Sequence, residues 1–192
     1  MTEQNRRSTD GRRRRSETSR DKIVEAMLAI VAEGQITPSA EQVALRAEVG
    51  LRSVFRHFKD MESLYAEMTA RLSRQYQMWL VPFTAPDWCG QLAEVIERRT
   101  STYEKLMPFK RAADAHRHES ATIQTEHART LAMMRARLKS LLPEEIREDE
   151  LRFETLDLLL SFETWQRLRV EQNLSARKAR ALLKAQVDRL TA

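Results

Sequence analysis

The sequence predicts an all-α protein, and three observations support this fold class. Only four glycines and five prolines occur in 192 residues, so the tight turns that join β-strands are scarce. Apolar residues recur three and four positions apart along most of the chain, which is the spacing of one helix face. No segment alternates polar and apolar residues as a half-buried strand does. We therefore expect helices from about residue 18 to the C-terminus.

Composition and charge exclude several classes of protein. Charged residues make up 32% and hydrophobic residues 42% of the chain, as in globular domains. No apolar run approaches the roughly 20 residues that span a bilayer, and no apolar core of a secretory signal follows the basic N-terminus. A single cysteine, Cys89, excludes an intrachain disulfide and a cysteine-based zinc site. We expect a cytoplasmic protein with no membrane partner.

The first 17 residues are polar and basic. Residues 1–20 hold seven arginines against three acidic residues, and the whole chain has a formal net charge of +5. Residues 1–17 lack the apolar side chains needed for a packed core, so we predict a disordered basic arm. Such an arm can follow phosphates or enter a minor groove, and a solubilising tail is the alternative. The arm residues predicted to contact DNA are Arg12, Arg13, Arg14 and Arg15.

Residues 18–66 carry the start and stop signals of several helices. Thr18 can cap the first helix, and Gly34 is its stop signal. The segment TPSAEQVALRAEVG starts a second helix, in which Ser39 and Gln42 have the spacing of a capping box. These signals predict two helices joined by a short connection.

A three-residue turn separates the second helix from another short one. The helical pattern breaks at Glu48–Gly50, resumes from Leu51 to Phe58, and begins again as a longer helix capped by Asp60. This order is a helix-turn-helix layout, in which the second short helix enters the DNA major groove.

The predicted second short helix has an apolar face and a cationic face. Val54 and Phe58 are four positions apart and share one face, while Arg52 and Arg56 form another stripe. Guanidinium groups bind guanine edges and phosphates in a bidentate way. The alternative is an ordinary amphipathic helix with a solvated basic face.

The segment AEVGLRSVFRHF at residues 47–58 resembles TetR/AcrR-family transcriptional regulators. Their pattern there runs roughly Ala-Gly-Val-Ser-x-Gly-Thr-Leu-Tyr-x-His-Phe. The lead-in QVALRAEVG and the exit FRHFKDMESLY extend the resemblance over about residues 18–66. It implies an N-terminal three-helix DNA-binding domain at residues 18–66. It also implies a helical ligand-binding and dimerisation domain at residues 67–192.

The sequence departs from the family pattern at several positions. Glu48 and Arg52 stand where the family usually has glycine, Gly50 replaces a serine cap, and Phe55 lacks the hydroxyl of the usual tyrosine. Leu51 is a candidate for contact with a thymine methyl group. The resemblance places Ser53 and His57 at phosphate-contacting positions. The predicted DNA contacts of this domain are Thr37, Gly50, Leu51, Arg52, Ser53, Phe55, Arg56, His57 and Lys59.

The C-terminal half carries further helical patterns. One helix is predicted to end before Pro108, another to run to about Asn173, and a last one to be capped by Ser175. The resemblance implies that the last two helices form a four-helix bundle across a homodimer. The predicted dimer contacts, for which a plain core role is the alternative, are Phe153, Leu160, Trp165, Leu183 and Val187.

Aromatic and methionine side chains suggest a ligand pocket in the same half, because apolar walls are the usual form of such pockets. Their alternative role is in the core. His116 and His118 are two positions apart and share no helix face, so we expect no metal. The predicted ligand-binding residues are Trp79, Trp88, Tyr103, Met107, Phe109 and Met133.

Together these patterns predict a sequence-specific DNA-binding regulator rather than an enzyme. No catalytic set and no glycine-rich phosphate loop are legible, and we expect no cofactor. The expected partners are a palindromic double-stranded DNA operator, a second copy of the chain and an unidentified small-molecule ligand. The resemblance implies a repressor that the ligand releases from its operator. The alternative is a basic helical protein that binds nucleic acid nonspecifically without ligand control.

Overall fold

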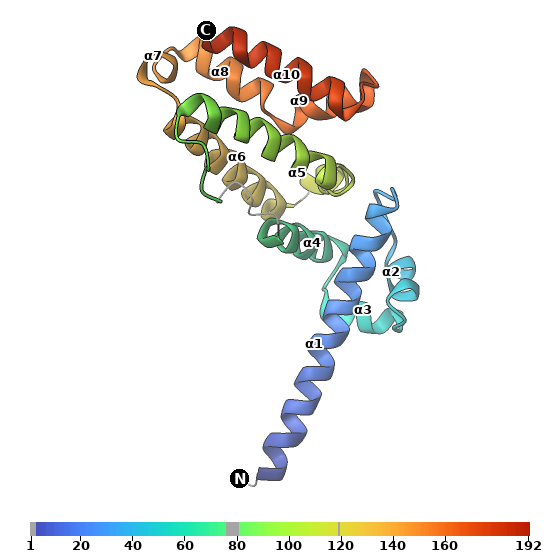
Figure 1. Ribbon diagram of the computed structural model, residues 1–192. Coiled ribbons are helices and arrows are strands. Elements are labelled where there is room, and N and C mark those ends of the chain that lie inside the picture. The colour runs from blue at the N-terminus through green and yellow to red at the C-terminus, as the bar shows by residue number, and fades with distance from the viewer. Residues whose placement is uncertain (1–2, 76–80, 119) are drawn as a thin grey trace. The chain divides into compact units, whose positions relative to one another are not determined.

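The chain is helical throughout its described part. The computed structural model describes residues 3–75, 81–118 and 120–192, with side chains from residue 16 onward. Within these ranges it forms ten α-helices, one π-helical segment and no strand (Figure 1), which confirms the predicted all-α class. None of the described helices is long and apolar enough to cross a membrane.

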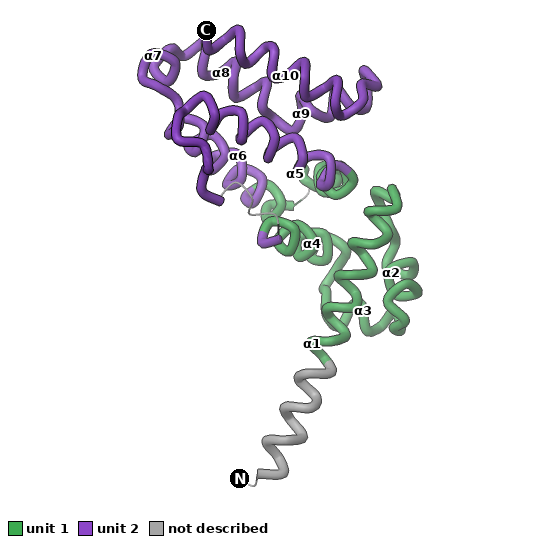
Figure 2. The backbone as a smooth tube through the Cα atoms, viewed as in Figure 1, with its two compact units in different colours: residues 1–73, 108–124 green, residues 74–107, 125–192 purple. Residues whose placement is uncertain are grey.

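Two compact units divide the chain (Figure 2). The first consists of Met1–Ser73 and Pro108–Gln124, and the second of Arg74–Met107 and Thr125–Ala192. The division differs from the single boundary at residues 66–67 that the sequence suggests. One reason is Tyr65, whose ring lies 3.9 Å from that of His116, so this later segment packs with the N-terminal helices.

Four helices form the N-terminal part of unit 1. They are α1 (Glu3–Ala32), α2 (Ala40–Arg46), α3 (Leu51–His57) and α4 (Met61–Gln75). The helix α1 packs against both α2 and α3, and the apolar face of α1 is buried at Ile23, Met27 and Val31. Ser63 N donates to Asp60 Oδ1 over 2.8 Å at the start of α4, which confirms Asp60 as its cap.

The N-terminal helix is longer than predicted. It begins at Glu3, so the prediction of a disordered arm over residues 1–17 is wrong for the backbone from residue 3, and Thr18 lies inside the helix rather than at its cap. Arginine, glutamate and glutamine have high helix propensity. The sequence also places acid four positions before arginine at Glu3 and Arg7 and at Asp10 and Arg14, a spacing that favours helix.

The helices of unit 2 surround two buried apolar clusters. One cluster includes Leu138, Leu156 and Leu160, and the other includes Trp165 and Leu183. The elements are α5 (Trp88–Arg117), α6 (Ala121–Leu141), α7 (Glu144–Arg147), α8 (Glu150–Leu159), α9 (Phe162–Gln166), η2 (Arg167–Glu171) and α10 (Ala176–Thr191). Three helices, α4, α5 and α6, contribute residues to both units.

One predicted helix end is wrong, and one predicted helix is divided in two. The helix α5 continues through Pro108 to Arg117, although proline has no N–H to donate to the carbonyl four residues earlier. Pro108 is also where α5 passes from unit 2 to unit 1. The helix predicted to run to about Asn173 is interrupted earlier, because Ser161 Oγ accepts from Thr164 N and caps the separate helix α9. The predicted cap Ser175 is confirmed, since it accepts from Lys178 N.

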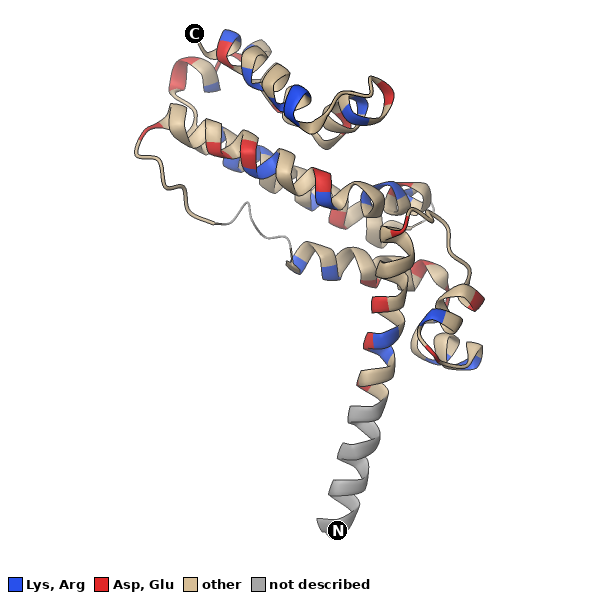
Figure 3. Cartoon of the chain, turned by 45° about the vertical axis from the view of Figure 1, so that its right-hand side comes forward, with Lys and Arg blue, Asp and Glu red and all other residues tan. Residues whose placement is uncertain are grey.

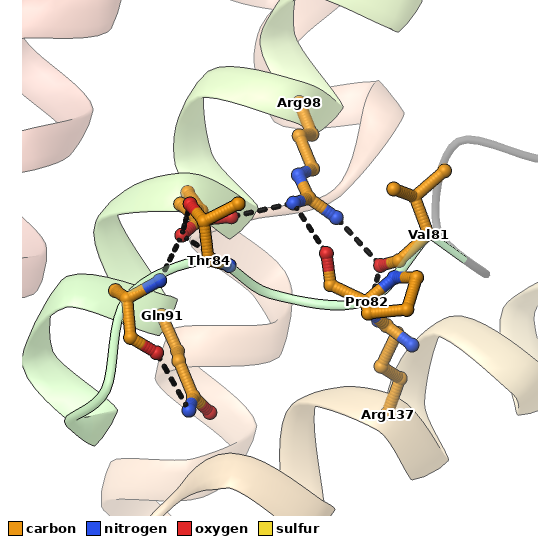
Figure 4. A network of polar contacts seen from close by, with 8 residues as sticks. Val81, Pro82, Thr84, Gln91, Arg98 and Arg137 are labelled. Atoms are coloured by element: carbon orange, nitrogen blue, oxygen red, sulfur yellow. Dashed lines mark hydrogen bonds and ion pairs between the residues drawn. The ribbon is translucent and has the colours of Figure 1, made fainter.

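A segment of extended chain, residues 81–86, is held against α5 and α6 by polar contacts (Figure 4). We call it the strap. Glu94 Oε1 accepts from Thr84 N at 2.9 Å, Thr84 Oγ1 at 2.6 Å and Ala85 N at 2.7 Å. Glu94 Oε2 accepts from Arg98 Nη2 at 2.5 Å. The hydrogen bonds from Thr84 and Ala85, with the charge of Arg98, lower the pKa of Glu94 to about 2.

This network predicts an acid-dependent share of stability. The folded pKa of Glu94 lies below its ordinary value of 4.5, so its contribution is present above that value and is lost as the pH falls toward 2. In Glu94→Gln we expect a lower melting temperature than wild type at pH 6. The difference should shrink between pH 4.5 and 2, as followed by circular dichroism.

Glu97→Gln is the matched control, because it removes an exposed carboxylate of α5 that pairs only with the side chain of Arg180 among the described residues. Its effect on the melting temperature should be smaller. A gap between wild type and Glu94→Gln that stays constant down to pH 2 would contradict the assigned role of this carboxylate.

Candidate nucleic-acid interface

The first short helix of the candidate site, α2, begins with a complete capping box. Ser39 Oγ accepts from Gln42 N at 3.3 Å, and Ser39 N donates to Gln42 Oε1 at 2.8 Å. This confirms the capping box predicted from the spacing of the two residues. Because both bonds satisfy backbone or side-chain groups at the helix start, they fix where α2 begins.

The turn between α2 and α3 is a Schellman motif with an unusual residue in its left-handed position. Val49 N donates to Ala44 O at 3.0 Å, and Glu48 N donates to Leu45 O at 3.2 Å. Glu48 has φ of 55°, a conformation in which glycine is normally found. At the end of α1 the same pair of bonds surrounds Gly34, with φ of 101°, which confirms Gly34 as the stop signal.

The second short helix, α3, has a buried side and an exposed side. Val54 is buried, and Phe58 is buried directly after the helix. Arg52 and Arg56 are exposed, as are Leu51 at 38% and Phe55 at 48%. A cationic stripe and an apolar stripe therefore lie next to each other on the solvent side of α3. We call these four exposed residues the reading face.

Contacts from α1 and α4 support the position of α3. The guanidinium of Arg20 lies over the ring of Phe58, 4.9 Å from its centre. Arg20 Nη2 also donates to Glu67 Oε2 of α4 at 2.6 Å, and the Arg71 guanidinium pairs with Glu25 of α1 at 2.7 Å. These ion pairs join α1 to α4.

The charged side chains of α3 and of the residue two positions after it are all positive. The helix α3 contains no acidic residue, and Lys59 follows it exposed to solvent. Lys and Arg are seen on the short helices beside α1 in Figure 3. Burial lowers the pKa of His57, and the charges of Arg56 and Arg20 lower it further. Uncharged His57 can accept a hydrogen bond, and its Nε2 lies 3.5 Å from Arg56 Nη2.

The predicted DNA contacts fall into four groups. Leu51, Arg52, Phe55 and Arg56 form the reading face. Ser53 and His57 are half-buried, so less of each side chain is open to a ligand. The side chains of Arg12, Arg13, Arg14 and Arg15, on the N-terminal part of α1, lie outside the described residues. Three further predicted residues are exposed beside the short helices, namely Thr37, Gly50 and Lys59.

Sequence reasoning missed the support role of Arg20, which it counted only as part of the basic arm. The signal for it is weak, because its partners Phe58 and Glu67 are far away in the sequence. It also missed the exposed leucines of unit 2, since Leu151 and Leu158 lie among buried apolar residues of the same helix.

The predicted dimer contacts lie in the core of unit 2 and do not reach its surface. All five side chains are buried within their own chain, which leaves almost none of their surface open to a second copy. Trp165 also donates through Nε1 to Glu104 Oε2 at 3.1 Å. The five residues are Phe153, Leu160, Trp165, Leu183 and Val187.

The predicted ligand-binding residues are distributed over separate parts of the structure. Trp88 packs on one apolar cluster of unit 2, and Tyr103 and Met107 belong to the other. Met133 is half-buried on α6, Phe109 lies in unit 1, and Trp79 lies outside the described residues. Within unit 2, Trp88 therefore packs on a different apolar cluster from Tyr103 and Met107. Among the described residues, no group of three or more His, Cys, Asp or Glu could hold a metal ion.

Comparisons with known proteins agree with this geometry. A protein from Rhodococcus sp., provisionally assigned as a TetR-family transcriptional regulator, shares 16% identity with a TM-score of 0.67, covering 91% of this chain and 99% of that one. A provisionally assigned transcriptional regulator from Pseudomonas aeruginosa PAO1 shares 19% identity with a TM-score of 0.65, covering 90% and 89%. One from Streptomyces coelicolor A3(2) shares 20% identity with a TM-score of 0.61, covering 91% and 98%.

These likenesses establish the fold. They extend over both units of the chain, with its helix-turn-helix and its helical C-terminal part. No protein-family model matches the sequence, and no curated protein matches it. The chain thus has the fold that the resemblance of residues 18–66 predicts.

The left-handed residue of the turn predicts a stabilising substitution. A residue with a side chain in this conformation costs about 1–2 kcal/mol, and glycine removes that strain while losing some free energy through its greater freedom when unfolded. In Glu48→Gly we expect the free energy of unfolding to rise by about 0.5–1 kcal/mol, as measured by urea denaturation.

Glu48→Gln is the control, because it removes the charge and keeps the Cβ atom. It should leave the free energy of unfolding within roughly 0.5 kcal/mol of wild type. An equal gain in both variants would assign the effect to charge and not to the backbone conformation.

Proposed function

We propose that the chain is a transcriptional regulator that binds a specific DNA sequence through α3. The observation that carries this proposal is the reading face, where Arg52 and Arg56 are exposed beside Leu51 and Phe55 on the second helix of a helix-turn-helix. In this motif the second helix enters the major groove, where base edges are distinguishable. No enzymatic role is proposed.

The two stripes of the reading face suit different features of the major groove. The guanidinium groups of Arg52 and Arg56 can donate to guanine O6 and N7, and Leu51 or Phe55 can contact a thymine methyl group. Lys59, Thr37 and the arginines of α1 are proposed to contact phosphates, which supply affinity with little sequence preference.

A homodimer is proposed to place two reading faces on a palindromic operator, because two-fold symmetric proteins read two-fold symmetric sites. The surface proposed for it replaces the buried residues predicted from the sequence. Leu151 is 82% exposed and Leu158 is 65% exposed on α8, and their spacing of seven places them on one face. Ala181, Leu182 and Ala185 are exposed on α10, which packs against α8.

Repression and its relief by a small molecule are proposed from the family resemblance. A ligand that prefers one conformation of the regulator would shift operator affinity by that preference, typically about 1–3 kcal/mol. The competing possibility is nonspecific binding of nucleic acid through charge alone. The reading face favours a specific site, because nonspecific binding requires no apolar side chains beside the arginines.

The proposal predicts that Arg52 discriminates between sequences. Operators would first be selected from a random duplex pool with the purified protein. Arg52→Ala should weaken binding to the selected operator by about 1–3 kcal/mol, because it loses hydrogen bonds to a base. Binding to a random duplex of the same length should change much less, as measured by fluorescence anisotropy at one salt concentration.

Arg177→Ala is the matched control, since it removes an exposed arginine of α10 in unit 2. Operator affinity should then stay close to that of wild type. Equal losses on operator and random DNA in Arg52→Ala would make Arg52 a phosphate contact. Failure to select any sequence would favour the nonspecific alternative.

The proposed dimer surface predicts that Leu158→Glu produces monomers. A charge in a desolvated contact between two chains costs several kcal/mol, so the dimer dissociation constant should rise at least 100-fold. Because Leu158 is exposed within its own chain, the fold should survive. Sedimentation equilibrium measures the association, and circular dichroism checks the helix content.

Leu45→Glu serves as the comparison, because Leu45 is an even more exposed leucine, in unit 1. It should leave the association unchanged. If Leu158→Glu remained fully dimeric, the interface would have to lie on another surface.

A further inference from the structure

A small hollow opens in unit 2 between the strap, α5 and α6. Its volume is about 20 Å³, room for a single small group such as a water molecule. Four apolar side chains and three arginines line it, and none of the lining residues is acidic. The lining residues are Phe83, Val95, Arg98, Arg99, Met134, Arg137 and Leu138.

Two of the three arginines have no carboxylate partner among the described residues. Arg99 is only 7% exposed, and it donates to Leu160 O at 3.1 Å and to Met134 O at 2.7 Å. Arg137 Nη2 donates to Val81 O at 2.6 Å. Only Arg98 has an acidic partner, Glu94. The hollow therefore keeps an excess of positive charge that main-chain carbonyls do not neutralise.

The strap brings two of these cations close together. Arg98 Nη1 also donates to Val81 O at 2.6 Å, so one carbonyl oxygen serves both Arg98 and Arg137 (Figure 4). The guanidinium carbons of Arg98 and Arg137 lie 5.2 Å and 4.3 Å from the centre of the Phe83 ring. Burial and the charge of Arg98 lower the pKa of Arg137, as expected of cations held close together.

A neutral carbonyl is a weak partner for two cations. A guanidinium already makes charge-assisted bonds to a carbonyl, but a carboxylate also brings the opposite charge and accepts two parallel bonds from one guanidinium. An anion that replaced Val81 O would therefore reduce the repulsion between Arg98 and Arg137. The excess charge and the shared acceptor point to an anion as the missing component.

We propose that this hollow binds the carboxylate head of a small organic acid, and that the head replaces Val81 O on Arg137 and Arg98. The size of the hollow favours a carboxylate over a larger phosphate. The hollow has room for the head alone, so the rest of the acid lies outside it. The biological role of this binding rests on the ligand control proposed above. The binding itself does not depend on DNA.

The test uses sodium octanoate as the probe and isothermal titration calorimetry of the full chain. Octanamide has the same tail with a neutral head, and inorganic phosphate and chloride have charge without a tail. Octanoate should bind at least tenfold more tightly than octanamide. Arg137→Gln should weaken octanoate binding roughly ten- to 100-fold, as expected for the loss of a charge-assisted hydrogen bond.

Arg129→Gln is the matched control, because Arg129 is a largely exposed arginine of the same helix, 3.9 Å from Glu126. It should bind octanoate as wild type does. Arg137→Lys is a second test, which applies if Arg137→Gln does not fold. It keeps the charge but has no planar pair of donors, so an intermediate loss is expected. Circular dichroism checks that each variant is folded.

Equal binding of octanoate and octanamide would overturn the proposal, as would undiminished octanoate binding in Arg137→Gln or no binding to wild type. Phosphate or chloride bound through Arg137 more tightly than octanoate would overturn the assignment of a carboxylate. Selection of a DNA operator without any acid is a separate measurement. If no operator is selected, the proposed function is refuted, and the octanoate result is unaffected.

Discussion

A helix of seven residues is too short to persist in water by itself, so the reading face depends on the burial of Val54 and Phe58. These two side chains are the apolar anchors of α3, and the helix packs against α1. Arg20 covers the ring of Phe58 and pairs with Glu67 at the same time. The directions of Arg52 and Arg56 therefore follow from the packing of residues that lie outside the reading face.

Unit 2 depends on a different kind of constraint, which is electrostatic. The strap has no helix or strand to satisfy its backbone, so side chains of α5 and α6 perform that task. Glu94 accepts from strap N–H groups, and Arg98 and Arg137 donate to a strap carbonyl. The arrangement satisfies the polar groups of the strap but places three arginines beside a hollow whose lining contains no carboxylate. The contacts that order the strap therefore leave an excess of positive charge beside it.

The helical class and the local signals could be predicted because they depend on neighbouring residues. Ser39 and Gln42 are three positions apart, and Gly34 needs no distant partner to take a left-handed conformation. The reading helix could be predicted for the same reason, since Val54 and Phe58 face one way and the arginines another. Local spacing was sufficient for each of these features.

The predictions that failed concern features that depend on residues far apart in the sequence. Leu156, Leu158 and Leu160 are equally apolar, and only packing against other helices decides that Leu158 is exposed while its neighbours are buried. Pro108 is a helix breaker by local rules, yet α5 continues through it with packing on both sides of the residue. The cluster of arginines around the strap likewise joins residues that lie up to 56 positions apart.

The left-handed conformation of Glu48 leaves the domain less stable than its fold permits. Evolution tolerates such a site as long as the protein remains above the stability needed for function. The position lies in the turn and outside the reading face, so relief of its strain would alter no side chain of that face. The site can therefore act as a suppressor position, where one substitution compensates for damage to the core of unit 1. Sequences related to this one could diverge further on α3 if they first acquired glycine there.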